Sequence, residues 1–153
     1  MSRLSFSRKK ASVIPELRPM YKVGKLLLIL KLCCAGGKAS LLKLHLFNWA
    51  MLDSQRMKTL QFSAERKELL LGVWGIDPSL NMALSYATSE GLLVRALNGS
   101  YKLTDKSEDF ISGVDLLDLF DIETDQLNSI AKKITEAMDL KNNFVIRCAK
   151  LWL

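Results

Sequence analysis

The sequence predicts a mainly α protein with a small β-hairpin, a winged helix-turn-helix with additional flanking helices. Three observations lead to this fold class. Two apolar segments joined by a Gly-rich turn predict helices over residues 20–34 and 41–52. Capping residues bracket a third helix over residues 78–90. An Asn-Gly dipeptide then joins two short β-patterned segments within residues 92–103, which predicts the hairpin.

The chain divides into three regions. Residues 1–19 are polar, basic and interrupted by prolines, and we expect a flexible basic arm. Residues 20–113 hold the predicted winged-helix domain. Residues 114–153 are expected to form a C-terminal helical extension, packed on the domain or on a partner. A length of 153 residues fits one domain with such an appendage.

The first predicted helix, residues 20–34, is apolar around most of its circumference, which is typical of a helix buried between neighbours. Gly36-Gly37 ends it. Ser40 is the expected N-cap of the next helix, residues 41–52. Residues 53–68 are mostly polar, and we expect a connection that is helical only in part.

The third predicted helix has well-defined ends. Asp77 is the expected cap, and Pro78 occupies the first helical position, where its missing N–H is not needed. Gly91 is expected just beyond the C-terminus in the left-handed conformation. The inward stripe comprises Leu80, Ala83, Leu84 and Ala87.

The predicted hairpin consists of strands over residues 92–96 and 100–103, with Asn98 and Gly99 as turn centres that both have positive φ. Thr104 is expected to cap the following helix. An acidic, apolar segment then leads to a last amphipathic helix, capped by Thr124 or Asp125, with its apolar face formed by Leu127, Ile130, Ile134 and Met138.

The charge of the chain is unevenly distributed. The formal net charge is +6, but residues 1–60 hold 12 Lys+Arg and 2 acids, whereas residues 61–153 hold 10 and 14. The basic half is suited to phosphates and the acidic half to a basic protein surface. The alternative is an ordinary solvated surface.

Composition favours a cytoplasmic protein outside the membrane. The basic start does not lead into the apolar core of a signal peptide. The longest apolar run, residues 26–30, is too short to cross a bilayer. The three cysteines, two of them adjacent, lack metal-ligand spacing and are expected to be reduced.

The residues needed for catalysis are missing. The one histidine, His45, lies in an apolar helix, where a packing role is favoured over a catalytic one. Neither a P-loop nor a dinucleotide-binding motif occurs, and no set of side chains has the spacing of a zinc or calcium site. Cys33 and Cys34 are expected to pack as small hydrophobic residues. We therefore expect a protein that is not an enzyme and has no catalytic residues, metal or cofactor.

Two binding roles remain, a DNA-binding one and a protein-binding one. The candidate DNA backbone contacts are Arg3, Arg8, Lys9, Lys10, Lys38 and Lys43. The helix that would enter the major groove, residues 78–90, contains no Lys or Arg, which favours a protein partner. The candidate partner interface comprises Leu80, Asn81, Tyr86, Phe144 and Trp152.

A resemblance points the same way. The segment RPMYKVGKLLLILKL at residues 18–32, followed by GGKASLLKLHLFNWA at residues 36–50, resembles the small middle component of bacterial ABC-three-component systems, to which Lamassu-type antiphage defence belongs. The resemblance implies a non-enzymatic adaptor. It would bridge an SMC/Rad50-like ATPase and an effector nuclease, and would approach DNA through that complex. The alternative is a winged-helix DNA-binding transcriptional regulator.

Overall fold

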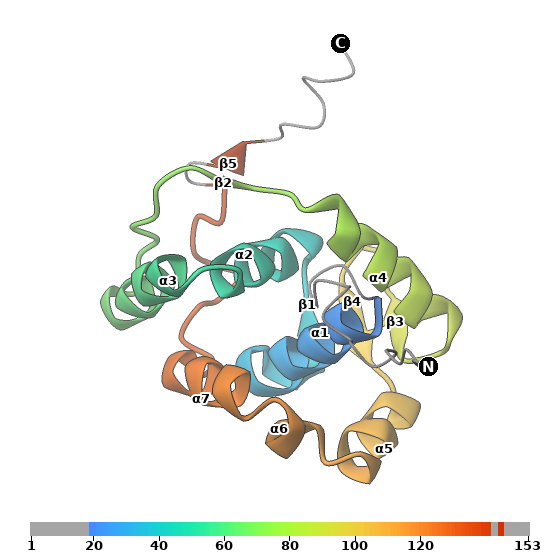
Figure 1. Ribbon diagram of the computed structural model, residues 1–153. Helices are drawn as coiled ribbons and strands as arrows, with labels where there is room; N and C mark the ends of the chain where they lie inside the picture. The colour runs from blue at the N-terminus through green and yellow to red at the C-terminus, as the bar shows by residue number, and fades with distance from the viewer. Residues whose placement is uncertain (1–18, 142–143, 146–153) are drawn as a thin grey trace, which may run out of the picture.

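The computed structural model describes residues 19–141 and 144–145 (Figure 1). Over these residues the fold is mainly helical, with seven α-helices and a three-stranded antiparallel sheet. The elements in chain order are α1 (Pro19–Cys33), η3 (Ala35–Gly37), β1 (Lys38–Ala39), α2 (Leu41–Met51), α3 (Ser54–Arg66), β2 (Trp74–Gly75), α4 (Pro78–Ser89), β3 (Leu93–Arg95), β4 (Tyr101–Leu103), α5 (Asp105–Gly113), α6 (Leu116–Leu119), α7 (Asp121–Ile130) and β5 (Phe144–Val145). None of the helices in the described part of the chain has the length and apolarity that crossing a membrane requires.

Helix α1 lies at the centre of the molecule (Figure 1). Nine consecutive residues, 22–30, are buried, so the helix has no solvent-exposed side over more than two turns. Helices α2, α4 and α7 and strand β4 all pack against it. The apolar circumference of this segment is therefore used for the protein's own core, as the sequence predicts for a helix between neighbours.

The three-stranded sheet has the order β1-β4-β3, with both pairs antiparallel. The hairpin between β3 and β4 has a different turn from the expected one. Gly99 has a φ of 89°, but Asn98 does not have a positive φ, and the N–H of Gly99 donates to the carbonyl of Ala96. Leu97 and Asn98 are therefore the turn centres, and only the following glycine is left-handed. This longer hairpin loop also matches the twist of the strands.

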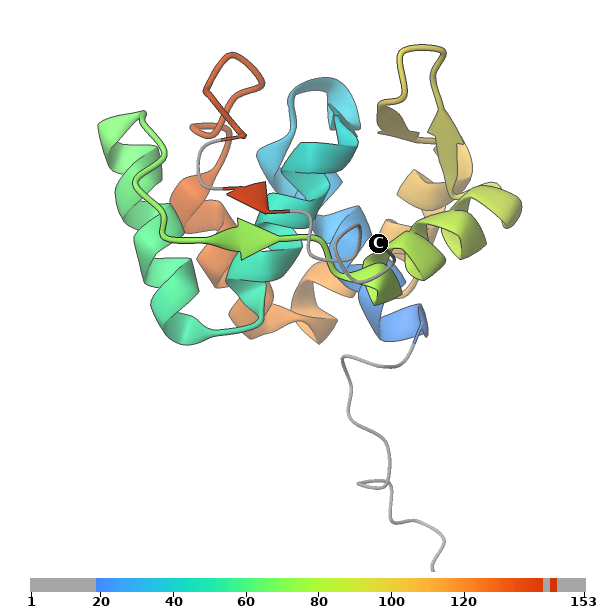
Figure 2. The same cartoon turned by 90° about the horizontal axis from the view of Figure 1, so that it is seen from above.

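Strand β2 belongs to a second, two-stranded sheet, in which it pairs with β5 in parallel. Trp74 lies opposite Phe144, and their ring centroids are 4.8 Å apart. Trp74 is buried and Phe144 is half-buried. This sheet lies against α2 (Figures 1 and 2).

The predicted caps of α2, α4 and α5 are confirmed. Ser40, Asp77 and Thr104 each accept a backbone N–H of the first turn of their helix. Gly91, with a φ of 79°, ends α4 in a Schellman motif, in which the N–H of Leu92 donates to the carbonyl of Ala87. These local interactions set where α2, α4 and α5 begin and where α4 ends.

Two predicted elements are wrong in extent. The polar connection over residues 53–68 is the complete helix α3, which begins at an Asp53 cap and buries Leu60 and Ala64 against its neighbours. The last helix begins at Asp121, before either predicted cap, and ends at Ile130. Ile134 is still buried, although it lies beyond the helix.

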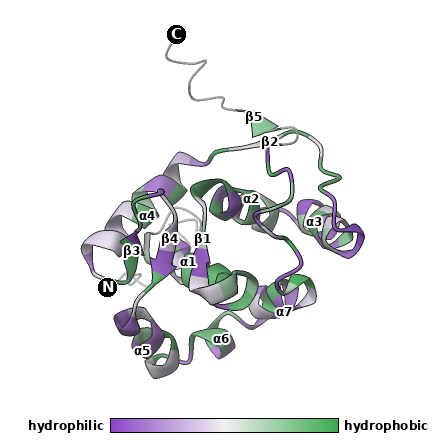
Figure 3. Ribbon diagram, turned by 180° about the vertical axis from the view of Figure 1, so that it is seen from behind, coloured by the Kyte–Doolittle hydropathy of each residue, from purple (hydrophilic) through white to green (hydrophobic). Residues whose placement is uncertain are grey.

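Helices α6 and α7 pack on the start of α1 through an aromatic contact. The rings of Tyr21 and Phe120 are 5.3 Å apart, and the Tyr21 hydroxyl donates to Glu123 at 3.1 Å. A Cβ at Gly24 would lie 2.9 Å from the Phe120 ring. Glycine in this turn of α1 therefore allows the close approach of α6. Figure 3 shows α5, α6 and α7 together along one side of the molecule.

The end of α3 gives a prediction about stability. Lys67 has a φ of 58° and takes the Schellman position that glycine usually occupies. Replacement Lys67→Gly removes the steric cost of this conformation and should raise the free energy of unfolding by about 0.5–1 kcal/mol. Urea unfolding measures the change. In the matched control Lys58→Gly, within the same helix, the free energy should fall by about 1 kcal/mol. Equal effects would contradict the prediction.

Candidate functional site

A buried polar cluster fixes the start of α4 against α1 and α2. Lys22 of α1 is 1 % exposed, and its ammonium donates to Asn48 of α2 at 2.8 Å and to the Asp77 carboxylate at 3.1 Å. The Asn48 amide also donates to Asp77. Asp77 in turn accepts the backbone N–H and the hydroxyl of Ser79. One carboxylate therefore both caps α4 and neutralises a buried cation.

The same contacts determine the ionisation of Asp77. Burial opposes the charge of this carboxylate, but hydrogen bonds from Ser79, Asn48 and Lys22 outweigh it and lower its pKa from 3.8 to about 2. The carboxylate is 27 % exposed. It is therefore ionised at neutral pH and is held by partners within the chain.

His45 has a structural role in this cluster. Its ring is buried, and Nδ1 accepts the backbone N–H of Asp77 at 3.4 Å. The other ring nitrogen, Nε2, therefore carries the hydrogen and donates to the Asn81 side-chain oxygen at 2.9 Å. Burial lowers the pKa of His45, which favours the neutral ring. The packing role that the sequence favoured agrees with these contacts.

The exposed side of α4 is uncharged. It consists of Asn81, Met82, Ser85, Tyr86 and Ser89, which we call the α4 outer face. Met82 is 69 % exposed and Tyr86 is 41 % exposed. Helix α4 runs along the outside of the molecule, beside β3 (Figure 1). Two of the predicted interface residues, Asn81 and Tyr86, lie together on this face.

The other predicted partner contacts are placed differently. Leu80 is 1 % exposed and belongs to the core, so the expectation that it contacts a partner is wrong. It lies on the inner stripe of α4, where its side chain contributes to the domain. Phe144 packs on Trp74 within the chain and is half-buried, so its contact with a partner stays a prediction. Trp152 lies outside the described residues.

The predicted DNA contacts are also divided. Lys38 is exposed on β1, directly opposite Lys102 of β4. Lys43 is 3 % exposed, and its ammonium donates to the carbonyl of Cys33 at 3.2 Å. The expectation that Lys43 contacts a phosphate is therefore wrong, because its charge satisfies the C-terminal end of α1. Arg3, Arg8, Lys9 and Lys10 lie outside the described residues.

Lys38 and Lys102 form an unusual pair on the exposed side of the sheet. Side chains directly opposite each other in an antiparallel pair are close, and like charges there repel. Neither ammonium forms an ion pair with any of the described residues. Lys102 was not among the sequence-predicted contacts, since only the strand register reveals that it faces Lys38. The register therefore places two positively charged residues opposite each other in the sheet.

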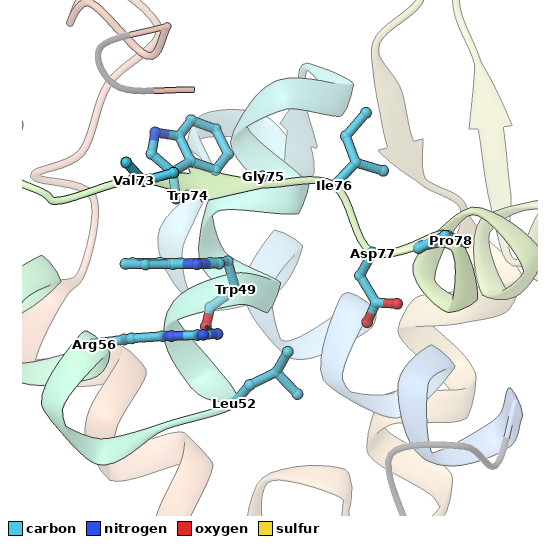
Figure 4. Close-up of a pocket in the computed structure, with 9 residues that line it drawn as sticks. All are labelled: Trp49, Leu52, Arg56, Val73, Trp74, Gly75, Ile76, Asp77 and Pro78. Atoms are coloured by element: carbon cyan, nitrogen blue, oxygen red, sulfur yellow. Dashed lines mark hydrogen bonds between the residues drawn. The ribbon is translucent and has the colours of Figure 1, made fainter. Parts of the chain in front are cut away.

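A pocket of about 490 Å³ opens between the end of α2, the start of α3 and the segment from Val73 to Pro78 (Figure 4). The Arg56 guanidinium lies over the Trp49 ring, 4.8 Å from its centroid, and donates to the Trp49 carbonyl. Leu52 lies beside them, and Asp77 lies across the opening (Figure 4). Sequence analysis missed this pocket because its walls come from separate elements.

Cys33 and Cys34 are buried free thiols. Burial raises their pKa values to about 12 and about 11, so both remain protonated and unreactive at neutral pH. The Cys33 thiol donates to the carbonyl of Leu127, which joins the end of α1 to α7. Within the described residues, no group of histidine, cysteine and carboxylate side chains is arranged to hold a metal ion.

Comparison of the chain with protein-family models, with curated proteins and with solved structures finds no match.

The Asp77 cluster gives a prediction about pH. The folded pKa of Asp77, about 2, lies below the ordinary value of 3.8. The ionised carboxylate therefore stabilises the native state above pH 3.8, and this stabilisation is lost as the pH falls toward 2. Asp77→Asn should lower the free energy of unfolding at pH 7, and its difference from the unsubstituted chain should shrink below pH 4.

Urea unfolding at several pH values measures this difference. The control is Asp109→Asn, on an exposed position of α5, which should remain close to the unsubstituted chain throughout. A gap between Asp77→Asn and the unsubstituted chain that has the same size at pH 7 and pH 2.5 would contradict the coupling of Asp77 to folding.

Proposed function

We propose that the chain is a non-enzymatic adaptor subunit of an SMC/Rad50-like ATPase complex in antiphage or anti-plasmid defence, where it bridges the ATPase and an effector nuclease. The observation that carries the proposal is the uncharged α4 outer face. The partners themselves come from the resemblance over residues 18–50. In this proposal the protein works in the cytoplasm, needs no cofactor and approaches DNA through the complex.

The arrangement of elements supports a winged helix-turn-helix as the scaffold. Helices α1, α2 and α4 precede the β3–β4 hairpin, and β1 joins the hairpin strands in the order β1-β4-β3. In this interpretation α4 is the second helix of the helix-turn-helix and the hairpin is the wing. Helix α3 is then an additional helix between α2 and α4.

The chemistry of α4 argues for a protein partner at the position where winged helices usually meet DNA. A helix in the major groove needs cations that reach phosphates, in addition to side chains that contact bases. The α4 outer face provides none, and the Asn81 side-chain oxygen already accepts a hydrogen bond from His45. Met82 and Tyr86, by contrast, are residue types enriched in protein interfaces.

The adaptor proposal predicts that one substitution on α4 releases a partner. Tagged chain isolated from cells that express its native operon should co-purify with an ATPase and a nuclease. Met82→Asp places a charge in the interface and should reduce recovery of one partner at least tenfold, which corresponds to about 1.4 kcal/mol. The circular dichroism spectrum should not change, because Met82 is 69 % exposed.

The matched control is Ile122→Asp on α7, since Ile122 is 67 % exposed. Recovery of both partners should be unaffected by this control. Elution of the unsubstituted chain as a lone monomer, with neither an ATPase nor a nuclease, would overturn the adaptor proposal.

The second candidate function is a winged-helix DNA-binding transcriptional regulator, and the pair of sheet lysines favours it. Lys38 and Lys102 lie side by side without an acidic partner among the described residues. Phosphate contacts of this kind provide affinity without sequence preference. A regulator would then read sequence through another part of the chain.

Direct DNA binding predicts a change in salt dependence. The double substitution Lys38→Glu with Lys102→Glu should weaken binding to a random duplex and reduce the slope of log affinity against log salt by about 2, since two phosphate contacts are lost. Fluorescence anisotropy over a range of salt concentrations measures the slope. The control pair, Lys58→Glu with Lys132→Glu, is exposed elsewhere and should retain it. An unchanged slope in the first double variant would exclude the sheet as a phosphate site.

A further inference from the structure

The pocket lies beside an edge of β2 with which no other strand of the described residues pairs. Among the described residues β2 pairs with β5 alone, so this sheet has two strands and β2 is an edge strand. The residues from Val73 to Pro78 line the pocket, whereas Phe144 of β5 does not. The pocket therefore lies on the side of β2 that faces away from β5. An edge strand of this kind is a template for pairing with another extended segment.

The charge of the pocket is set by Arg56. Asp77 is already matched by Lys22 at 3.1 Å. Arg56 is half-buried, stacks on Trp49 and forms no ion pair with any of the described residues. Its guanidinium is held in place by the bond to the Trp49 carbonyl, at 3.3 Å. A fixed guanidinium with unused donors is suited to a carboxylate.

Apolar residues next to Arg56 in the pocket indicate which side chains should flank the carboxylate of a ligand. Leu52 and Val73 are 40 % and 60 % exposed at the pocket. The Trp49 ring lies between Val73 and Arg56, and Leu52 lies on the same side of this ring as Arg56 (Figure 4). One face of this ring is covered by the guanidinium, so that face is not open for stacking by a nucleobase. Aliphatic side chains next to the carboxylate would cover the exposed leucine and valine.

We propose that the β2 edge and its pocket bind an extended peptide segment of a partner protein, in which an internal Asp or Glu is flanked by aliphatic residues. The peptide backbone pairs with the open edge of β2, its carboxylate contacts Arg56, and its aliphatic side chains cover Leu52 and Val73. Such strand addition obtains affinity from main-chain hydrogen bonds and specificity from the pockets for side chains. This site is separate from the α4 outer face and does not depend on the adaptor proposal.

The test uses the full chain, labelled with nitrogen-15, and the blocked peptide acetyl-Thr-Val-Glu-Val-Thr-amide. Titration at pH 7 should shift the backbone amides of residues 73–76 and the indole N–H of Trp49. The same peptide with Gln in place of Glu should bind at least tenfold more weakly. Replacement of the first Val by Pro should abolish binding, because proline cannot donate to the strand.

Two arginine variants separate recognition from folding. Arg56→Gln should bind the Glu and Gln peptides equally. The matched control is Arg66→Gln in the same helix, because Arg66 also lies over an aromatic ring, that of Phe62, at 5.1 Å, but does not line the pocket. This control should keep the tenfold preference. Unchanged amide spectra away from the pocket establish that both variants are folded.

Four outcomes would overturn the proposal. The first two are no shift of the amide signals at millimolar peptide, and equal binding of the Glu and Gln peptides by the unsubstituted chain. The other two are stronger binding of a peptide that offers only a free C-terminal carboxylate, and shifts of the same amide signals by an oligothymidylate at a lower concentration than the peptide requires. The third outcome would indicate capture of a chain terminus, and the fourth a nucleic-acid site. Failure of this test would leave the α4 pull-down result unaffected, so the two proposals are distinguishable.

Discussion

The burial of α1 on all sides is the constraint on which the rest of the structure depends. A small domain usually leaves one face of each helix in water, but residues 22–30 are all inside. Neighbours must then surround the helix, and α2, α4, α7 and β4 do so. The additional helices beyond the hairpin follow from this requirement, because without α7 the C-terminal half of α1 would lose an apolar cover.

A fully buried helix that carries lysines needs an internal partner for each charge, since an unpaired buried cation is costly. Lys22 obtains one from Asp77, and this pairing fixes the first turn of α4 relative to α1. The ammonium of Lys25 lies over the Tyr21 ring, beside α6 and α7. The orientation of the α4 outer face is therefore a consequence of charge compensation inside the core.

The helix ends were predictable from sequence because a cap depends on residues within one turn. Ser40, Asp77 and Gly91 illustrate this. The candidate sites were less predictable, because they depend on partners distant in sequence. Lysine is usually a surface residue, yet the ammonium of Lys43 is buried because it donates to a backbone carbonyl ten residues earlier in the chain. The Lys38–Lys102 pair depends on the register of β1 and β4, and the Arg56 pocket depends on how α2, α3 and β2 pack together. Residue type and periodicity specify neither arrangement.

The placement of the lysines also changes the meaning of the net charge. Of the twelve Lys and Arg residues in the basic half, Lys22, Lys25 and Lys43 are buried. Their charges act on the core, so the field outside the described domain is weaker than composition suggests. Of this half, Lys31, Lys38 and Lys58 are exposed and Arg56 is half-buried among the described residues. Lys38 lies opposite Lys102 on the sheet, Arg56 lies beside β2, and the α4 outer face is neutral. Local, differing surfaces suit a protein that holds several partners at once, whereas a continuous basic face would suit one that holds DNA along its length.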